Sequence, residues 1–346
     1  MKKLHILFLI IIGVATTSCE RAFMKADELS TPVNVFDYLW KKVDQQYAFF
    51  DVKGVDWDSV YEVYRPKVDE EDMHVDSLFK VCGAMLNTLR DGHTNLISKF
   101  DVSHNDSVYY KMYAEKNIDE QVVVLNYLTV NYHTTGSFAH NAIRNGEVAY
   151  IRYSSFMDDF TTDNLYYLIN RYENCKGLIL DLRQNGGGNL ANISTLLSIF
   201  DNHGQPLYQT QIKSGPEHDA FTELKTVYAD SINYDDPFTE APYTKRVAVL
   251  IDRGSYSATS FFAICTMGYD NIKLFGDYSG GGLGLPNGGA LPNGWTYRFS
   301  ITRTIALDGG NYENGVPPDV RVLIDPESSA QGIDNVIEAA ADWIMQ

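Results

Sequence analysis

The chain has 346 residues, of which 45% are hydrophobic and 21% charged, as is usual for a globular protein of one large domain or two modest ones. Its formal net charge of −17 argues against a nucleic-acid partner, because phosphate binding requires a basic surface.

The first residues predict a targeting segment rather than part of the fold. A short basic start precedes an apolar run from Ile6 to Val14, which is too short to span a bilayer. The Ser18-Cys19 pair that follows resembles the end of a bacterial lipobox. We therefore expect a lipoprotein signal peptide over 1–18, a lipid anchor in the membrane on Cys19, a tether over 19–33 and a location in the bacterial cell envelope. An ordinary secretory signal cleaved nearby is the alternative.

Residues 34–94 are expected to form a small helical domain. Apolar side chains recur at the three-and-four spacing of a buried helix face from Val35 to Tyr47, from Trp57 to Tyr64 and from Leu78 to Leu89. Asp91-Gly92 ends the third helix, and His93 follows at once. Taken alone, His93 is more often a structural or surface histidine than a catalytic one.

From residue 95 onward, predicted strands alternate with helices, which indicates an α/β core with its site at the strand ends. The expected strands are Gln121–Leu125, Glu147–Tyr153, Gly177–Leu182, Val247–Ile251, Ile272–Gly276, Trp295–Ile305 and Val320–Ile324. The expected helices are Leu165–Tyr172, 190–200, the segment after Ser255 to Ser260, and 330–345. Residues 202–245 should be an irregular excursion, and 276–294 a loop.

The cysteines give no sign of a disulfide framework or a metal site. If Cys19 is lipidated, Cys82, Cys175 and Cys265 remain, an odd number in apolar surroundings, and we interpret them as small core residues. None has a second cysteine at the spacing of a zinc motif, so we expect no metal.

The glycine turn at 186–188 lies between a buried strand and a helix. A dinucleotide fingerprint requires a third glycine three places after Gly188, where Ala191 stands. We therefore expect no nucleotide and no other cofactor. The turn could bring backbone N–H groups close to a reacting carbonyl, or it could be a tight packing turn.

Ser257 lies where the strand Val247–Ile251 turns into an apolar helix. Unpaired N–H groups and a positive dipole at a helix start suit a nucleophile, although serines there also cap helices. Thr259 stands where an α/β-hydrolase elbow requires glycine, so a Ser-His-acid set must be built in another way.

Taken together, the motifs resemble the C-terminal processing (tail-specific) and tricorn-type serine peptidases over roughly residues 35–325. The matching segments, in the order of the family, are the helical start, Leu89–Thr94 (LRDGHT), Leu180–Gly188 (LDLRQNGGG), Ser255–Ser260 (SYSATS) and Glu313–Asp319 (ENGVPPD). The resemblance implies an α/β (α+β) chain whose residues 95–346 form a crotonase/ClpP-like β-α spiral core. The stretch 95–146 is too short for the full PDZ module of the processing enzymes.

The resemblance also implies roles for individual residues. Ser257 matches the nucleophile, and the N–H of Ala258 would form the oxyanion hole with that of Gly187 or, alternatively, Gly186. The region of the catalytic lysine reads SGGGLG and contains no lysine. The tricorn-like branch instead uses a histidine and a late glutamate, whose places are filled by His93 and Glu313.

This chemistry is consistent with a metal-free serine peptidase that cleaves unfolded or short peptides. A serine hydroxyl needs a nearby base, and a histidine that titrates near neutrality can take its proton and later protonate the leaving amine. An inactive peptide-binding lipoprotein on the same scaffold is the alternative, and an esterase is a third possibility. The sequence leaves the oligomeric state open.

Overall fold

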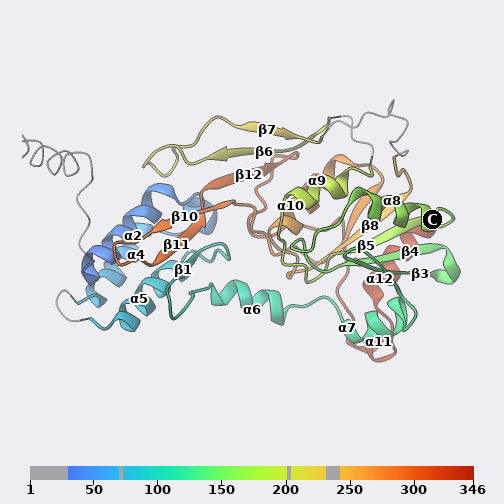
Figure 1. The fold of residues 1–346 in the computed structure, drawn as a ribbon, viewed down its shortest axis with the longest axis horizontal. Coiled ribbons are helices and arrows are strands. Elements are labelled where there is room, and N and C mark those ends of the chain that lie inside the picture. The colour runs from blue at the N-terminus through green and yellow to red at the C-terminus, as the bar shows by residue number, and fades with distance from the viewer. Residues whose placement is uncertain (1–29, 70–72, 201–203, 231–241) are drawn as a thin grey trace, which may run out of the picture.

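The computed structural model describes residues 30–69, 73–200, 204–230 and 242–346 (Figure 1). The predicted signal peptide, Cys19 and most of the predicted tether lie outside these ranges. Within them, none of the helices is both long and apolar enough to cross a bilayer.

The N-terminal lobe combines helices with a small sheet. Its helical elements are α2 (Pro32–Gln46), α3 (Phe50–Lys53), α4 (Trp57–Tyr64), the 3₁₀-helix η1 (Arg65–Lys67) and α5 (Val75–Asn87). Thr31 caps α2 by accepting a hydrogen bond from the N–H of Asn34 at 3.3 Å. The predicted apolar face of α2 is buried. A sheet of order β1-β11-β10 packs on these helices, with β1 at Asn95–Ile97, β10 at Pro286–Ala290 and β11 at Thr296–Ser300.

A seven-stranded sheet of order β13-β9-β8-β5-β4-β3-β2 forms the core at the other end of the molecule (Figure 1). The strands are β2 (His133–Thr135), β3 (Phe138–Ile143), β4 (Val148–Tyr153), β5 (Gly177–Asp181), β8 (Arg246–Ile251), β9 (Ile272–Gly276) and β13 (Val320–Arg321). From β4 to β13 neighbouring strands are parallel, so their carboxyl ends lie at one edge. The mixed α/β fold confirms the predicted class.

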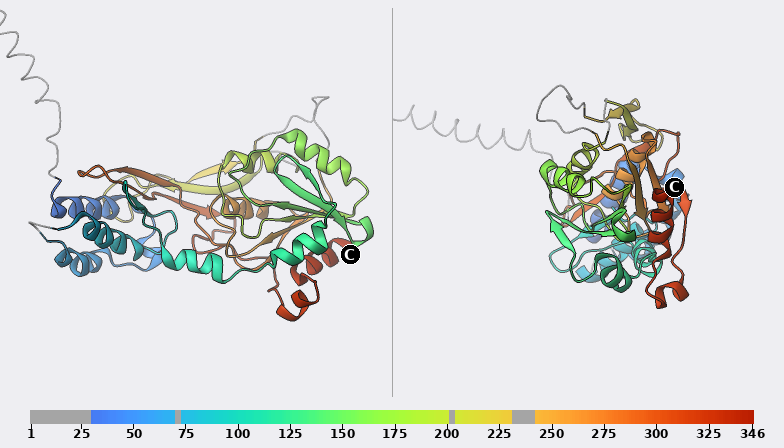
Figure 2. Two further views of the ribbon diagram at one scale, coloured as in Figure 1. Left: turned by 60° about the horizontal axis from the view of Figure 1, so that its bottom comes forward. Right: turned by 90° about the vertical axis from the view of Figure 1, so that its right-hand side faces the viewer.

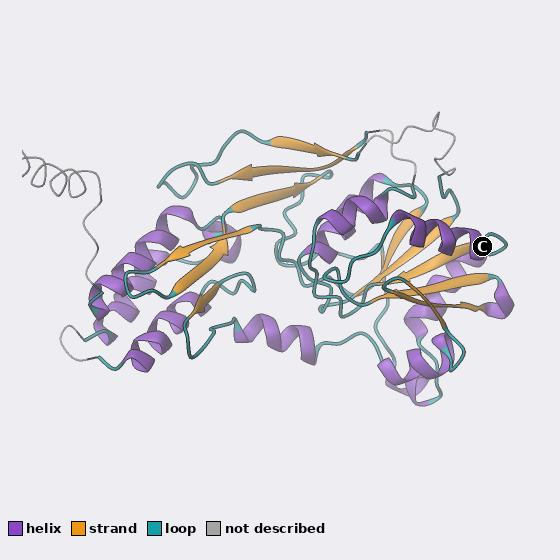
Figure 3. Ribbon diagram, viewed as in Figure 1, coloured by secondary structure: helices purple, strands orange, loops and turns teal. Residues whose placement is uncertain are grey.

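Helices cover both faces of this sheet (Figure 3). The helices α8 (Thr162–Arg171), α9 (Ala191–Leu197) and α10 (Ala258–Cys265) pack in one apolar cluster with one face. The helix α7 (Glu120–Val122), the π-helix η2 (Val123–Leu128) and α12 (Asn335–Met345) pack on the other. The remaining short helices are η3 (Arg144–Gly146), η4 (Thr266–Gly268) and α11 (Pro326–Ala330).

Two further elements run between the lobe and the core (Figures 1 and 2). One is a sheet of order β12-β6-β7, with β6 at Pro206–Ile212, β7 at Lys225–Tyr228 and β12 at Thr302–Ala306. The other is helix α6 (Asp106–Ala114), on the opposite side in Figure 1.

Several predicted elements differ from the structure. The strand prediction for Gln121–Leu125 was wrong, because this segment is helical, and the side chain of Asp119 caps it by accepting from the N–H groups of Gln121 and Val122. The excursion 202–245 contains β6 and β7, and the loop 276–294 contains β10. The single strand predicted for Trp295–Ile305 is two strands on either side of Ile301.

The three cysteines at 82, 175 and 265 are buried and unpaired, as predicted for core residues. The domain boundary predicted at residue 94 stays a prediction. Five later buried residues nevertheless pack in the same apolar cluster as the N-terminal helices: Leu96, Leu291, Trp295, Tyr297 and Phe299.

Candidate active site

Ser257 occupies a strained turn between β8 and α10. Its backbone angles, φ 56° and ψ −118°, lie in a region that residues other than glycine rarely adopt. Such a conformation costs about 1–3 kcal/mol. The turn is held because the N–H of Ser257 donates to the Gly281 carbonyl at 2.9 Å and that of Tyr256 to the Asn185 carbonyl at 3.0 Å. Every residue of α10 is buried, so the turn is anchored on a rigid helix. The hydroxyl of Ser257 caps nothing, which leaves it available.

His93 reaches this serine from the N-terminal lobe. Its Nε2 lies 3.0 Å from Ser257 Oγ, within hydrogen-bond distance. The backbone N–H of His93 donates to Asp91 Oδ1 at 2.7 Å, which fixes the segment beyond α5. Burial lowers the pKa of His93, although the charge of Asp91 opposes that shift. The imidazole is therefore neutral at pH 7 and can accept the serine proton.

Glu313 lies close to this pair, but none of the hydrogen bonds among the described residues joins it to His93. Its Oε2 accepts from the N–H groups of Leu283 and Gly284, at 2.7 and 3.0 Å. The carbonyl of Gly284 in turn contributes to raising the pKa of His93. The Nδ1 of His93 is buried and has no partner at hydrogen-bond distance among the described residues, so the Gly284 carbonyl acts on the imidazole from slightly farther away. The hydrogen bonds of Glu313 within the described ranges thus lead to the backbone of residues 283–284 and not to the imidazole itself.

Lys53, which the sequence analysis did not single out, is a buried cation beside Glu313. Its side chain is 5% exposed, and its Nζ lies 3.4 Å from Glu313 Oε1 and 2.7 Å from Asn314 Oδ1. Burial raises the pKa of Glu313 to about 7, while the charge of Lys53 lowers it. In the sequence, a lysine at the end of a helix is indistinguishable from a solvated one.

Asp91 is a second carboxylate that the sequence analysis treated only as a helix end. It is 1% exposed, and besides the His93 N–H its carboxylate accepts from Ser300 Oγ at 2.8 Å. Its charge raises the pKa of Glu313 and counteracts the lowering of that of His93. Asp91 stands two residues before His93 in the sequence, so its place near the histidine could be predicted. Its hydrogen bond with Ser300 could not, because Ser300 lies 209 positions away.

The predicted oxyanion-hole residues gather beside the serine. A Cβ at Gly187 would lie 2.8 Å from the Ala258 nitrogen and 2.9 Å from Ser257 Cβ, so this close approach requires glycine. The N–H of Gly187, however, donates to Asn185 Oδ1 at 3.0 Å. Gly186 is exposed, and no hydrogen bond from its N–H occurs in the described part of the chain.

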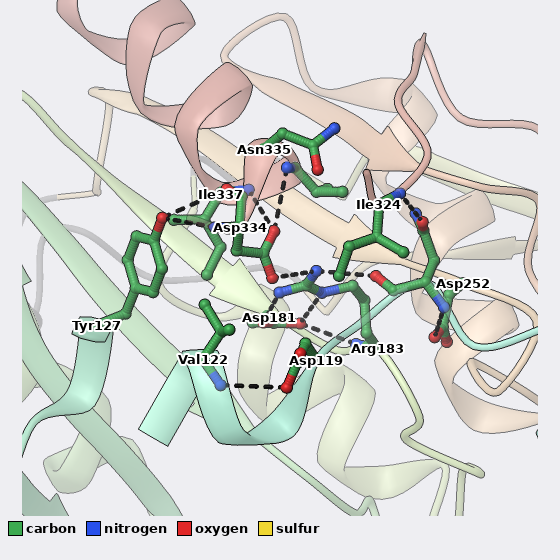
Figure 4. A network of polar contacts seen from close by, with 12 residues as sticks. Asp119, Val122, Tyr127, Asp181, Arg183, Asp252, Ile324, Asp334, Asn335 and Ile337 are labelled. Atoms are coloured by element: carbon green, nitrogen blue, oxygen red, sulfur yellow. Dashed lines mark hydrogen bonds and ion pairs between the residues drawn. The ribbon is translucent and has the colours of Figure 1, made fainter. Parts of the chain in front are cut away.

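A buried polar network holds the glycine turn in place (Figure 4). The guanidinium of Arg183 is fully buried, donates to both carboxylate oxygens of Asp181 at 3.0 and 2.6 Å, and donates to Asp334 at 2.9 Å. Burial raises the pKa of Asp181, but the charges of two neighbouring arginines hold it at about 2. Asp252, after β8, accepts from the N–H of Gln184 at 2.8 Å. The turns after β5 and β8 are thereby fixed relative to each other.

The fold and its sequence relatives define the class of the chain, a serine-type peptidase. It belongs to peptidase family S41, whose model matches residues 147–322, about half of the chain. The model of the tricorn protease C1 domain matches residues 33–87. The resemblance to C-terminal processing and tricorn-type peptidases is thus confirmed.

Individual relatives agree with this assignment. A solved structure from Parabacteroides merdae, assigned as a peptidase, is 34% identical, with a TM-score of 0.84, over 92% of this chain and 98% of that one. The photosystem II D1 C-terminal processing protease shares the fold at 16% identity and a TM-score of 0.51, over 89% and 97% of the two chains. The carboxy-terminal processing protease CtpA of Bacillus subtilis is 24% identical over 185 residues, which are 53% of this chain and only 36% of that protein.

Proposed function

We propose that this chain hydrolyses peptide bonds in unfolded or short peptides, with Ser257 as nucleophile and His93 as general base. The observation that carries the proposal is the 3.0 Å separation of His93 Nε2 and Ser257 Oγ at a strained, rigidly held turn. Membership of the peptidase family supports the choice of an amide bond as the target.

The proposed reaction proceeds in two halves. Ser257 Oγ attacks the peptide carbonyl carbon while His93 Nε2 takes the hydroxyl proton, and the carbonyl oxygen becomes an oxyanion. The N–H of Ala258 and that of Gly186 or Gly187 donate to this oxyanion, each donor being worth about 3–4 kcal/mol. His93 then passes its proton to the leaving amine, which leaves an acyl ester on Ser257. Water, deprotonated by His93, hydrolyses this ester.

Glu313 supports the base indirectly in this scheme. Its carboxylate holds the N–H groups of residues 283–284 and so positions the Gly284 carbonyl near the imidazole. In its ionised form Glu313 also favours the imidazolium that forms during the reaction, because a nearby negative charge raises the pKa of a histidine. Glu313 is therefore a positioning residue in our proposal rather than a direct partner of His93.

A fluorophosphonate probe tests the nucleophile. We expect labelling of the wild type and of Ser214→Ala, since Ser214 is exposed on another part of the surface, and none of Ser257→Ala. His93→Gln should retain the fold and lose most peptide turnover. Peptide binding without probe labelling of the wild type would instead select the inactive binding protein, and turnover of esters but not amides would select an esterase.

We also propose that the protein is anchored in the cell envelope through Cys19. The basic start, the apolar run Ile6–Val14 and the Ser18-Cys19 pair support this. Labelling with radioactive palmitate in a bacterial host should occur in the wild type and not in Cys19→Ala. Equal labelling of both would contradict the anchor.

A further inference from the structure

The imidazole of His93 lacks the direct acidic partner that a catalytic histidine usually has. Its Nε2 lies 3.0 Å from Ser257 Oγ, whereas its Nδ1 is buried and makes no hydrogen bond with a described residue. In a serine–histidine–acid triad, a carboxylate at that nitrogen orients the ring and stabilises the imidazolium. Here the carboxylates of Asp91 and Glu313 accept from backbone N–H groups instead. A contact other than a hydrogen bond at Nδ1 therefore holds the ring.

The charges around His93 do not by themselves favour its protonated form. Burial lowers the pKa of His93, the charge of Asp91 opposes that shift, and the charges of Arg298 and Lys53 lower the pKa further. Glu313 is paired with Lys53, and burial raises its pKa to about 7, so this carboxyl group is only partly ionised at neutral pH. Two cations thus oppose the imidazolium, and one fully charged carboxylate supports it.

Tyr256 packs against this imidazole from the serine turn. The centroids of the two rings lie 5.1 Å apart, and their planes are inclined at 56°. Aromatic rings attract each other in such tilted arrangements. A cation within about 6 Å of the centroid of an aromatic ring is also attracted by its π electrons, and the imidazole of His93 lies inside that distance. The residue next to the proposed nucleophile therefore contacts the proposed base.

Three glycines leave room for the ring of Tyr256 and enclose it. A Cβ at Gly92 would lie 2.8 Å from the tyrosine hydroxyl oxygen, and one at Gly282 would lie 2.3 Å from its Cζ. A Cβ at Gly280 would lie 3.0 Å from its Cδ2. Gly92 directly precedes His93, whereas the other two glycines belong to the segment after β9. These backbones leave the ring little space to move away from the imidazole.

The ring of Tyr256, and not its hydroxyl, is suited to act on the base. Burial raises the pKa of Tyr256 well above its usual value, and the charges of Asp91 and Glu313 raise it further. The phenol therefore stays neutral at pH 7 and cannot act as a base. Its oxygen is buried and has no hydrogen-bond partner within the described ranges, which costs stability and adds none. What the side chain contributes is its aromatic surface.

We propose that the aromatic ring of Tyr256 positions the imidazole of His93 and stabilises its protonated form, and this rests on the function proposed above. When Ser257 Oγ gives its proton to Nε2, a positive charge forms on a buried imidazole. The π electrons of the neighbouring ring attract that charge more strongly where water is excluded. Tyr256 is thus a positioning residue that acts through the base and does not touch the reacting atoms.

Two substitutions separate the ring from the hydroxyl. Tyr256→Phe keeps the ring and removes the unpartnered oxygen, so kcat/KM should stay within about threefold of the wild type and the unfolding temperature should not fall. Tyr256→Leu keeps an apolar side chain without π electrons, so kcat should fall roughly tenfold with little change in KM. Tyr208→Leu is the control, because it removes a partly buried ring that packs on Phe261 of α10, and kcat should not change.

A titration of His93 distinguishes an effect on the imidazolium from a loss of packing. The measurement is nuclear magnetic resonance of isotope-labelled histidine, in which the His93 signal is the one that His93→Gln removes. In Tyr256→Leu the pKa of His93 should fall by about half a unit or more, because the imidazolium loses its aromatic partner. Tyr256→Phe and Tyr208→Leu should leave it unchanged. The acid limb of kcat/KM should move to lower pH in the leucine variant alone.

The titration requires no activity, so it separates this proposal from the proposed function. If the wild type neither cleaves peptides nor reacts with the fluorophosphonate probe, the peptidase proposal fails, yet a lower pKa of His93 in Tyr256→Leu but not in Tyr256→Phe would still support the ring contact. An unchanged pKa in Tyr256→Leu would overturn it. A loss of turnover in Tyr256→Phe as large as that in Tyr256→Leu would also overturn it, because the hydroxyl would then be responsible.

A fluorinated phenylalanine at position 256 covers the case in which Tyr256→Leu does not fold. Fluorine atoms withdraw π electrons from the ring and change its shape little. Relative to Tyr256→Phe, the fluorinated protein should show a lower pKa of His93 and a lower kcat, since the attraction of the ring for a cation is weakened. Equal values in the two proteins would refute the stabilisation of the imidazolium while leaving the serine and the histidine as the proposed reacting pair.

Discussion

Replacing Lys53 by methionine is the sharpest test of how the site is held together. Lys53 is the cation that pairs with Glu313, whose side chain is 1% exposed. At a separation of 3.4 Å and an effective dielectric of about 20, the two charges attract by roughly 5 kcal/mol. Removing one partner of such a buried pair typically costs about 3–5 kcal/mol, a large share of the 5–15 kcal/mol that stabilises a domain.

The loss should depend on pH in a definite direction. Burial raises the pKa of Glu313 from 4.5 to about 7, and Lys53 lowers it, so Lys53→Met raises it further. A carboxyl group with a raised pKa in the folded state binds more protons there than in the unfolded state. Its contribution to stability is present at low pH and is lost as the pH rises through the folded-state pKa. The destabilisation by Lys53→Met should therefore be smallest in acid and largest above pH 7.

The same substitution should change the pH profile of activity. Burial and Arg298 lower the pKa of His93, and Lys53 lowers it further, so removal of Lys53 should move the acid limb of kcat/KM to higher pH. The measurements are peptide turnover across pH and urea unfolding on both sides of pH 7. Asn314→Ala is the control, because it removes the hydrogen bond of Lys53 but leaves the charge pair.

A double variant separates charge from packing. Lys53→Met combined with Glu313→Gln leaves no unpaired charge, so it should regain most of the stability lost in the single variant but not the activity. If Lys53→Met alone changed the free energy of unfolding by less than about 1 kcal/mol and left the acid limb in place, the lysine–glutamate pair would not control this site.

Two further predictions follow from the same geometry. Asp91→Asn removes a charge that raises the pKa of both His93 and Glu313, so the acid limb of kcat/KM should move to lower pH. This is opposite to the shift expected for Lys53→Met. A shift to higher pH would refute the role of the Asp91 charge. Gly187→Ala should lower kcat at least a hundredfold, because a methyl group there would lie 2.5 Å from the nearest backbone oxygen. Gly186→Ala, with nothing within 4 Å of the new methyl group, should keep wild-type stability, and equal stability of both variants by thermal unfolding would contradict the close approach.

Local patterns in the sequence predicted most helices and the central strands. The apolar residues from Val35 to Val43 recur at helical spacing and predict α2. The short β-branched run of β8 predicts a buried strand. The segment Gln121–Leu125 did not, because a short apolar run fits a buried strand or a buried helix equally well. In the structure, Val122 and Val123 pack in one apolar cluster with α12, which is distant in the sequence.

The candidate site likewise contains residues that the sequence predicts and contacts that it does not. Ser257 and His93 stand in motifs that can be read locally, and the structure brings them together. The partners of Glu313 are backbone N–H groups and Lys53, and no sequence pattern distinguishes these from solvated groups. Sequence reasoning thus found the proposed nucleophile and base but not the groups that surround Glu313.

The site combines residues of the N-terminal lobe with a residue of the core, so its geometry depends on how these two parts are held relative to each other. Asp91 and His93 come from the N-terminal lobe, whereas Ser257 comes from the core. The lobe is completed by β11, since Asn95 pairs with Arg298 in an antiparallel register. A chain cut at residue 94 would expose the apolar face of β11 and lose the histidine at once. The proposed base and nucleophile thus meet across 164 positions of the sequence, and no local motif sets the distance between them.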